Sequence, residues 1–182
     1  MKGKIAIIGA GITGLTLAQL LQGTFDVRLY EKSWRPGGRM STRHSDEFQF
    51  DHGTQYFTIR SSGFRNFLNK ALMDGIIRPW EARFMAFDGD NPLEYEKRQE
   101  VVYVGTPSMN SLCRYLARDL EVKCDTDVKN CRYVAEGWFL SFANGIEEGP
   151  FDLLISTIPA PQNDDLFAED INYLINYIFN IF

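Results

Sequence analysis

Near its N-terminus the chain carries a glycine-rich turn between an apolar run and a helical pattern. Residues 5–8 are apolar without a break, which is typical of a parallel strand buried on both faces. The turn Gly9-Ala10-Gly11-Ile12-Thr13-Gly14 follows directly, and apolar residues then recur at helical spacing from Leu15 to Leu21. A second strand is predicted over residues 26–31. This order predicts a strand–helix–strand unit of a parallel sheet, and it constrains the fold more than any other feature of the chain.

Each glycine of this turn has a physical task if the turn holds the phosphates of an adenine dinucleotide. Gly9 permits the tight turn, Gly11 leaves room for a pyrophosphate, and Gly14 lets the helix lie close to the sheet. The N–H groups and the dipole at the helix N-terminus attract the phosphates. Glu31, at the end of the second strand, can accept hydrogen bonds from both ribose hydroxyls. We therefore expect a dinucleotide site here, and the alternative is a glycine-rich turn that binds nothing.

A basic loop with two adjacent glycines follows a few residues after Glu31. Its sequence is Arg35-Pro36-Gly37-Gly38-Arg39-Met40-Ser41-Thr42-Arg43, and its position returns it to the mouth of the predicted site. The glycine pair permits close approach of the backbone. Arg39 can form two parallel hydrogen bonds with phosphate oxygens, which a lysine could not do equally well. A solvated basic loop is the alternative, and the preceding dinucleotide turn disfavours it.

Length and composition exclude several classes of protein. The chain has 182 residues, 45% of them hydrophobic, which suits one domain with a small insertion. Its net charge of -5 argues against a nucleic-acid-binding protein. The three cysteines show no C-x-x-C spacing and the two histidines are distant from them, so no metal site is predicted. The apolar stretch before Gly9 is too short for a signal peptide or a membrane span, and we expect free thiols and a cytoplasmic location.

The rest of the chain predicts further helices and strands. A helix begins at Ser61 or Ser62 and stops at Gly75, and Pro107 opens another helix. Antiparallel strands are expected over residues 76–104 around the turn 88–92. The remaining predicted strands cover residues 47–51, 121–124, 127–134, 138–142 and 151–158.

This layout indicates a parallel sheet that is interrupted by an insertion and then resumed. The predicted parts are residues 1–58, an insertion at 59–103, a second part at 104–162 and an atypical tail at 163–182. The tail contains no Lys or Arg and is interrupted by asparagines, so it is not expected to be a membrane anchor.

The two glycine motifs together resemble the flavin amine oxidase superfamily, whose FAD proteins have the glutathione-reductase type of nucleotide fold. A narrower resemblance is to the renalase-like branch of predicted NAD/FAD-dependent oxidoreductases. It is carried by residues 39–42, by Asp51-His52-Gly53-Thr54-Gln55-Tyr56-Phe57-Thr58 and by residues 155–162. In all, the resemblance covers roughly residues 2–162.

The resemblance implies an α/β fold: an FAD-binding, Rossmann-like parallel sheet, with an inserted segment of antiparallel strands and a helix that belongs to the substrate domain. It also implies that FAD is bound non-covalently. Val128 would offer backbone hydrogen bonds to adenine, Pro159 would end a strand near the flavin, and Arg43 with residues 55–57 would approach the isoalloxazine. The implied cofactor-binding residues are Gly9, Gly11, Ile12, Thr13, Gly14, Glu31, Lys32, Gly37, Gly38, Arg39, Met40, Arg43, Gln55, Tyr56, Phe57, Val128 and Pro159.

The activity that the resemblance implies is that of an FAD-dependent oxidoreductase. Substrate hydride would pass to flavin N5, and O2 or another acceptor would reoxidise the flavin. Amines or dihydronicotinamides are the implied substrates, and no catalytic residue is assigned. Members of this family are longer, and no Gly-Asp flavin segment follows Gln162, so we expect a truncated or frameshifted product. The alternatives are a non-catalytic remnant and an NAD-binding module.

Several other side chains keep two interpretations at this stage. His52 is either a catalytic base or a packing residue beside the cofactor. Cys113 lies on the apolar face of a helix and is expected to be structural. Five aromatic residues form either a substrate wall or the core of the insertion: Tyr56, Phe57, Trp80, Phe84 and Phe87.

Overall fold

The computed structural model describes residues 1–81, 87–92, 100–163 and 165–167. The chain divides into two compact units. The first unit comprises Met1–Arg39 with Leu116–Phe182, and the second comprises Met40–Tyr115. The boundaries predicted at residues 58 and 103 concern the cofactor and substrate domains, and they stay predictions. Apart from residues 163 and 165–167, the predicted tail lies outside the described residues.

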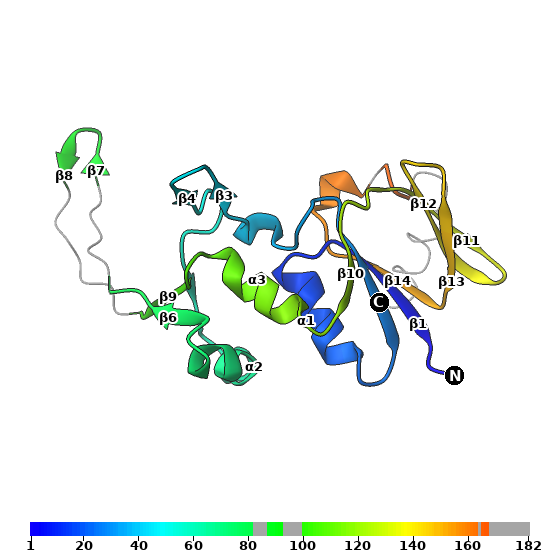
Figure 1. Ribbon diagram of the computed structural model, residues 1–182, viewed down its shortest axis with the longest axis horizontal. Helices are drawn as coiled ribbons and strands as arrows, with labels where there is room; N and C mark the ends of the chain where they lie inside the picture. Colours follow the sequence, from blue (N-terminus) through cyan, green and yellow to red (C-terminus); the bar gives the residue numbers. More distant parts are fainter. Residues whose placement is uncertain (82–86, 93–99, 164, 168–182) are drawn as a thin grey trace. The chain divides into compact units, whose positions relative to one another are not determined.

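A four-stranded parallel sheet forms the centre of the first unit (Figure 1). Its strands, in spatial order, are β10 (Glu121–Lys123), β2 (Asp26–Tyr30), β1 (Lys4–Ile8) and β14 (Leu153–Ser156). Helix α1 (Ile12–Leu21) connects β1 to β2 and buries Leu15 and Ala18. The parallel sheet and the strand–helix–strand unit predicted from the glycine motif are therefore confirmed.

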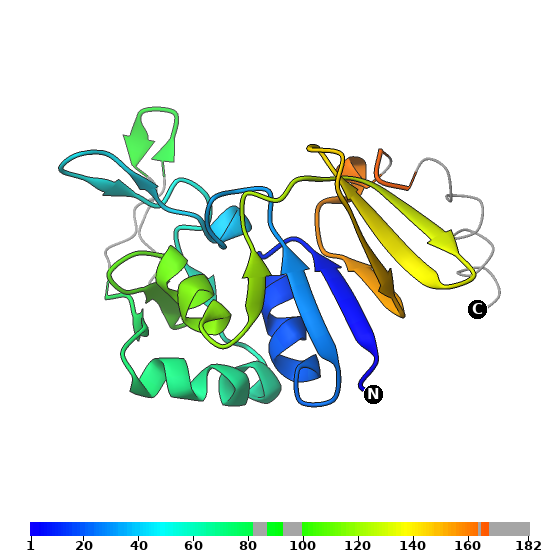
Figure 2. The same cartoon turned by 45° about the vertical axis from the view of Figure 1, so that its right-hand side comes forward.

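An antiparallel meander in the same unit packs on the parallel sheet (Figure 2). It consists of β11 (Val128–Val134), β12 (Gly137–Phe142) and β13 (Glu147–Phe151). Apolar side chains from both sheets, together with Leu166 from the segment after β14, form one core. Its sheet residues are Ala6, Ile8, Tyr30, Val128, Cys131, Trp138, Leu140 and Phe151. Burial in this core raises the pKa of the Cys131 thiol to about 12.

The single strand predicted over residues 151–158 is wrong, because two strands divide this stretch. Phe151 ends β13 and Leu153 begins β14. Between them, the Asp152 carboxylate accepts the Lys4 N–H at 2.7 Å, and the Asp152 N–H donates to the Lys4 carbonyl at 2.9 Å. These two bonds direct the chain from the meander into the parallel sheet beside β1.

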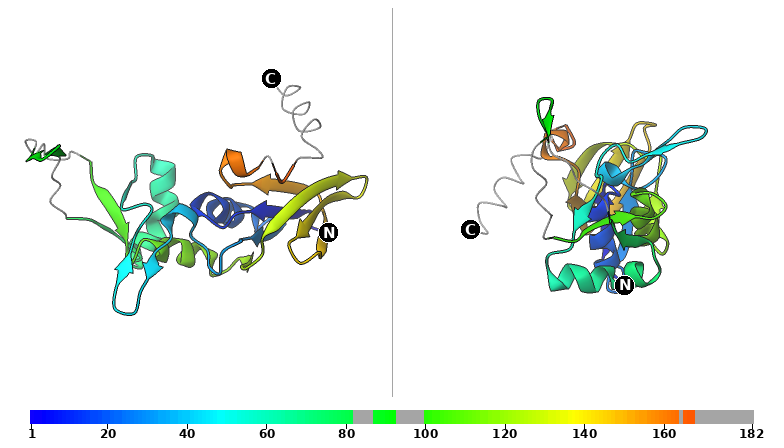
Figure 3. Two further views of the ribbon diagram at one scale, coloured as in Figure 1. Left: turned by 90° about the horizontal axis from the view of Figure 1, so that it is seen from above. Right: turned by 90° about the vertical axis from the view of Figure 1, so that its left-hand side faces the viewer.

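The second unit combines two helices with short antiparallel strands. Its elements are β3 (Arg43–His44), β4 (Gln49–Phe50), β5 (Phe57–Thr58), α2 (Ser62–Met73), β6 (Ile77–Pro79), β7 (Phe87–Asp88), β8 (Asn91–Pro92), β9 (Val102–Gly105) and α3 (Asn110–Ala117). The strands pair as β5-β9-β6, as β3-β4 and as the hairpin β7-β8 (Figure 3). The Ser61 hydroxyl accepts the Phe64 N–H, and Gly75 with a φ of 69° follows the end of α2, so both predicted ends of this helix are confirmed.

Two local predictions in the second unit are wrong. The strand expected over residues 47–51 is reduced to Gln49–Phe50, and Phe48 and Phe50 are 61% and 53% exposed. The helix expected to open at Pro107 begins at Asn110 instead. Side chains from distant residues accept the N–H groups at its start, so its first turn is set by tertiary contacts rather than by proline. Cys113 is fully buried on this helix, as predicted, and burial raises its pKa to about 12.

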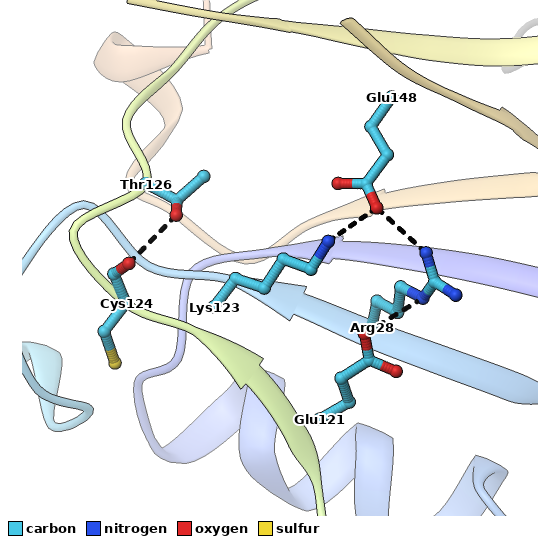
Figure 4. Close-up of polar contacts among 6 residues, drawn as sticks. All are labelled: Arg28, Glu121, Lys123, Cys124, Thr126 and Glu148. Atoms are coloured by element: carbon cyan, nitrogen blue, oxygen red, sulfur yellow. Dashed lines mark hydrogen bonds and ion pairs between the residues drawn. The ribbon is translucent and has the colours of Figure 1, made fainter. Parts of the chain in front are cut away.

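A charged cluster joins the meander to the parallel sheet. Glu148 of β13 accepts hydrogen bonds from Arg28 of β2 at 2.8 Å and from Lys123 of β10 at 2.6 Å (Figure 4). Arg28 also pairs with Glu121 at 3.2 Å. Burial alone would raise the pKa of Glu148, but the hydrogen bonds from Lys123 and Arg28 outweigh it, and the pKa is lowered.

Replacing Glu148 with Gln is expected to lower the free energy of unfolding by about 1–3 kcal/mol at neutral pH, because bonds to charged groups contribute on that scale. A lowered pKa in the folded state stabilises the fold above the ordinary carboxyl pKa, and this stabilisation is lost as the pH falls through the lower value. The difference between wild type and variant should therefore shrink towards roughly pH 3. Urea unfolding of both proteins at neutral pH and at roughly pH 3 measures this difference in stability.

Glu147 is the matched control for Glu148. It is exposed and pairs with Arg132 at 3.0 Å on the outer part of the meander. Exposed ion pairs contribute little, so Glu147→Gln should have a much smaller effect. Equal destabilisation by the two substitutions would contradict a joining role for Glu148.

Candidate functional site

Three strands of the first unit end at one edge of the parallel sheet. Ile8 at the end of β1 pairs with Tyr30 of β2 and with Ser156 of β14. Gly9, Glu31 and Thr157 follow these residues directly, so they lie at the same carboxyl edge. In open parallel sheets, ligands bind outside this edge.

The glycine turn leaves β1 here and packs tightly against α1. Gly9 has a φ of 97°, and its N–H donates to the Tyr30 carbonyl at 2.8 Å. A Cβ added at Gly14 would lie 2.1 Å from the Gly9 carbonyl oxygen. No side chain fits at this distance, so the close helix packing predicted for Gly14 is confirmed.

Gly11 occupies a different environment, because the fold itself does not require a glycine there. It precedes α1 with a φ of −76°, which any residue adopts, and an added Cβ would meet only the Gly38 Cα at 4.0 Å. The first turn of α1 contains no acidic residue. The N-terminus of α1 therefore keeps its positive dipole for an anion, with room for it beside Gly11.

The basic loop returns to this turn as the sequence predicted. Gly37 forms a parallel bridge with Gly11, and its N–H donates to the Ala10 carbonyl at 3.0 Å. Gly38 has a φ of 51°, and a Cβ added there would lie 3.2 Å from the Gly11 Cα. Gly38 opens the short 3-10 helix Gly38–Met40, in which Arg39 is exposed.

Glu31 is held rigidly between the turn and the loop that follows β2. Its side chain is buried, with a residue exposure of 6%. One carboxylate oxygen accepts the Ala10 N–H at 2.9 Å, and the other accepts the Ser33 N–H at 2.9 Å. Each oxygen has a second lone pair, so the carboxylate can still accept ribose hydroxyls.

The other predicted cofactor-binding residues of the first unit differ in their exposure to solvent. Val128 is buried at the start of β11, in the core beneath the meander. Pro159 is exposed and precedes the 3-10 helix Ala160–Gln162. Lys32 is exposed, with its amine 3.5 Å from the Gln162 side-chain oxygen. Ile12 is half-buried and Thr13 is exposed in the first turn of α1.

The predicted residues of the second unit are placed within that unit only. Arg43 and Gln55 are exposed, whereas Met40 is buried. The Tyr56 ring lies 6.1 Å from the Trp80 ring, and the Phe57 ring lies 6.1 Å from that of Tyr103, measured between centroids. Both aromatic residues thus have packing neighbours.

Other side chains that carried two interpretations keep them. His52 is exposed, which leaves the base and packing roles open. Of the proposed aromatic wall, Phe84 and the side chain of Phe87 lie outside the described residues.

Two residues of the family motifs have a contact that the sequence analysis missed. The Thr42 hydroxyl donates to Asp51 at 2.6 Å, and the Met109 N–H donates to the same carboxylate at 3.1 Å. The Asn110 N–H donates to the Thr42 hydroxyl at 3.2 Å. Both side chains thus accept N–H groups at the start of α3. No local sequence pattern predicts this cap, because the side chains that accept its N–H groups belong to residues distant in the sequence.

Thr157 was also missed, although a signal was present. It is a polar residue placed directly after an apolar parallel strand, at the edge where ligands bind. Its hydroxyl lies beside the glycine turn.

The described residues contain neither a cluster of metal-ligating side chains nor a membrane-spanning helix. In that part of the chain, no group of three or more His, Cys, Asp and Glu side chains is placed to hold a metal ion. The helices of the same residues include none that is long and apolar enough to cross a membrane.

Comparison with known proteins bears on this site. Residues 7–71 match the family model of the NAD(P)-binding Rossmann-like domain. Mouse renalase (Mus musculus) is 27% identical over 183 aligned positions, which cover 94% of this chain and 51% of renalase. The chain is similar to renalase along nearly its whole length. The renalase-like resemblance predicted from the motifs is therefore confirmed, and the chain spans about half the length of this relative.

Other relatives match shorter stretches or the fold alone. Coproporphyrinogen III oxidase of Staphylococcus aureus (strain NCTC 8325 / PS 47) is 37% identical over 65 residues, which cover 34% of this chain and 14% of that enzyme. A candidate protoporphyrinogen oxidase from Exiguobacterium sp. 255-15 has a TM-score of 0.68 at 13% identity, covering 93% of this chain and 62% of that one. A candidate FAD-containing monooxygenase from Photorhabdus luminescens subsp. laumondii TTO1 has a TM-score of 0.57 at 18% identity, covering 85% of this chain and 39% of that one. These likenesses confirm the predicted fold class.

Proposed function

We propose that this chain binds FAD non-covalently and forms part of an FAD-dependent oxidoreductase. The observation that carries the proposal is the environment of Gly11. The fold leaves open space for a side chain at this position, yet the residue is glycine and faces the N-terminus of α1. A pyrophosphate bound there explains the glycine, because it needs the room that a side chain would take.

The residues around this turn fit the adenosine half of FAD. The N–H groups at the start of α1 would bind the pyrophosphate, and Glu31 would accept the ribose hydroxyls with its remaining lone pairs. Arg39 would pair with the phosphates. On the strength of the resemblance, Arg43 and residues 55–57 would contact the isoalloxazine.

FAD, when bound, supplies the hydride acceptor for oxidation of an amine or a dihydronicotinamide, and O2 or another acceptor then reoxidises it. The task of the protein is to bind and orient the cofactor and the substrate. The test is anaerobic mixing of the FAD-loaded chain with amines and with dihydronicotinamides while the flavin absorbance is followed. Saturable bleaching by one class supports an oxidoreductase and identifies the substrate class, whereas FAD binding without bleaching by either class supports the alternative of a non-catalytic remnant.

A second candidate is an NAD-binding module. The match of residues 7–71 to the NAD(P)-binding domain favours it, since the same turn serves both dinucleotides. The loop around Arg39, which resembles a motif of FAD proteins, favours FAD instead. Identification of the nucleotide that the protein carries separates the two candidates.

Replacing Arg39 with Ala is expected to weaken FAD binding by roughly tenfold or more. A charge-assisted hydrogen bond contributes about 1.5–3 kcal/mol, and Arg39 is exposed and available for a phosphate. Arg39→Lys should recover only part of the affinity, because a lysine cannot form two parallel bonds. Flavin fluorescence titration measures each affinity. Arg114→Ala, which removes an exposed arginine of α3, controls for net charge, and an equal loss in that variant would argue against the role of Arg39.

A further inference from the structure

Thr157 lies where β14, the glycine turn and α1 meet. Its hydroxyl oxygen is 3.0 Å from the Ile8 carbonyl oxygen and 3.1 Å from that of Gly9. The Ile8 carbonyl already accepts the backbone N–H of Thr157 at 2.9 Å. A hydroxyl has a single proton to donate. Because the Ile8 carbonyl already accepts an N–H, the Gly9 carbonyl depends more on the Thr157 hydroxyl for a hydrogen bond.

Two glycines of the turn leave the space that this hydroxyl fills. A Cβ added at Gly9 would lie 2.9 Å from the Thr157 hydroxyl oxygen, and so would a Cβ added at Gly14. The hydroxyl therefore packs against both glycines as well as bonding to the turn.

The Gly9 carbonyl and the Ala10 N–H belong to one planar peptide group, and side chains hold both of its ends. Thr157 bonds to the carbonyl end, and the Glu31 carboxylate accepts the N–H end at 2.9 Å. Rotation of this peptide would break both contacts at once. The orientation of the turn and the place of the Glu31 carboxylate are thus linked through Thr157.

We propose that Thr157 is a positioning residue for the dinucleotide. Its hydroxyl fixes the Gly9–Ala10 peptide, and this peptide in turn fixes both the turn that faces the pyrophosphate and the carboxylate that faces the ribose. The inference rests on the proposed function, namely that this turn binds a dinucleotide. Thr157 acts through other groups and is not itself assigned a contact with the cofactor.

Three substitutions at Thr157 separate the hydroxyl from the bulk of the side chain. Thr157→Val keeps the shape, but places a methyl group beside two carbonyl oxygens and removes the donor. Thr157→Ser keeps the donor. Thr157→Ala removes the hydroxyl without adding a methyl group, and it serves if the valine variant does not fold. Since a neutral hydrogen bond contributes about 0.5–1.5 kcal/mol, loss of the hydroxyl should weaken dinucleotide binding roughly three- to tenfold.

Thr126 offers a matched control at the same edge of the parallel sheet. Its hydroxyl donates to the Cys124 carbonyl at 2.9 Å, just beyond the end of β10 (Figure 4). Thr126→Val thus removes the same kind of bond at the same edge of the sheet without touching the glycine turn.

The experiment measures FAD and NAD affinity of the full chain and its variants by titration, together with the unfolding free energy of each without nucleotide. We expect Thr157→Val to bind FAD three- to tenfold more weakly, and Thr157→Ser and Thr126→Val to remain within about twofold of wild type. Wild-type affinity in Thr157→Val, equal losses in Thr157→Val and Thr157→Ser, or an equal loss in Thr126→Val would overturn the proposal.

The same titrations distinguish failure of this inference from failure of the proposed function. If the wild type binds NAD but not FAD, the FAD proposal is wrong, and the ranking of the variants with NAD still decides the role of Thr157. If the wild type binds neither dinucleotide, both proposals are wrong.

Discussion

A Gly11→Ala chain is expected to fold as stably as the wild type and to bind FAD roughly 10- to 100-fold more weakly. The added Cβ would meet only the Gly38 Cα, at an ordinary contact distance of 4.0 Å. In the complex, however, the methyl group would occupy space that the pyrophosphate needs, and overpacking of this kind costs about 1–3 kcal/mol. Urea unfolding without nucleotide and titration with FAD measure the two effects separately.

The contrast between unchanged stability and lost affinity is what makes this substitution informative. A glycine that served only the turn would produce the opposite result, a loss of stability with little change in binding. Wild-type FAD affinity in Gly11→Ala would contradict the placement of the pyrophosphate.

Gly14→Ala is expected to destabilise the first unit by about 3 kcal/mol, the upper range for overpacking. The new Cβ would lie 2.1 Å from the Gly9 carbonyl oxygen and 2.9 Å from the Thr157 hydroxyl oxygen. Because the first of these atoms belongs to the backbone, relief requires that α1 move away from the turn. The measurement is the free energy of unfolding in urea, with no nucleotide present.

Gly63 provides the matched control for this substitution. It lies in the first turn of α2, and an added Cβ there would meet nothing within 4 Å. Alanine has the higher helix propensity, by about 1 kcal/mol, so Gly63→Ala should be neutral or stabilising. Equal stability of the two alanine variants would contradict the claim that close packing of α1 on the turn requires glycine at position 14.

The elements that the sequence predicted well are those set by neighbouring residues. The apolar run, the glycine turn and the helical spacing lie together in the chain. Strands β1 and β2 form within about a residue of the expected bounds, and α1 ends at Leu21, the last residue of the helical pattern. Strand β13 was missed because its sequence, Glu-Glu-Gly-Pro-Phe, shows no apolar alternation. It forms because β12 pairs with it and because its final Phe151 reaches the core.

In the candidate site too, features set by neighbouring residues could be predicted, and features set by distant residues could not. The tight turn at Gly9 and the close helix packing at Gly14 could be predicted, since these tasks follow from a motif of fixed spacing. The start of α3 could not be predicted, because Asp51 and Thr42 accept its first N–H groups across more than 50 residues of chain. Nor does the sequence reveal that the Glu31 carboxylate is already held by Ala10 and Ser33, since that contact depends on the folded turn.

The most direct test of this account identifies the nucleotide that the purified chain binds. The protein is saturated with an equimolar mixture of FAD and NAD, separated from free nucleotide and denatured, and the released nucleotide is identified by chromatography. The account predicts that FAD is released, and that it leaves the denatured chain freely because it is held without a covalent bond. Release of NAD alone, or of no nucleotide, would contradict the central claim.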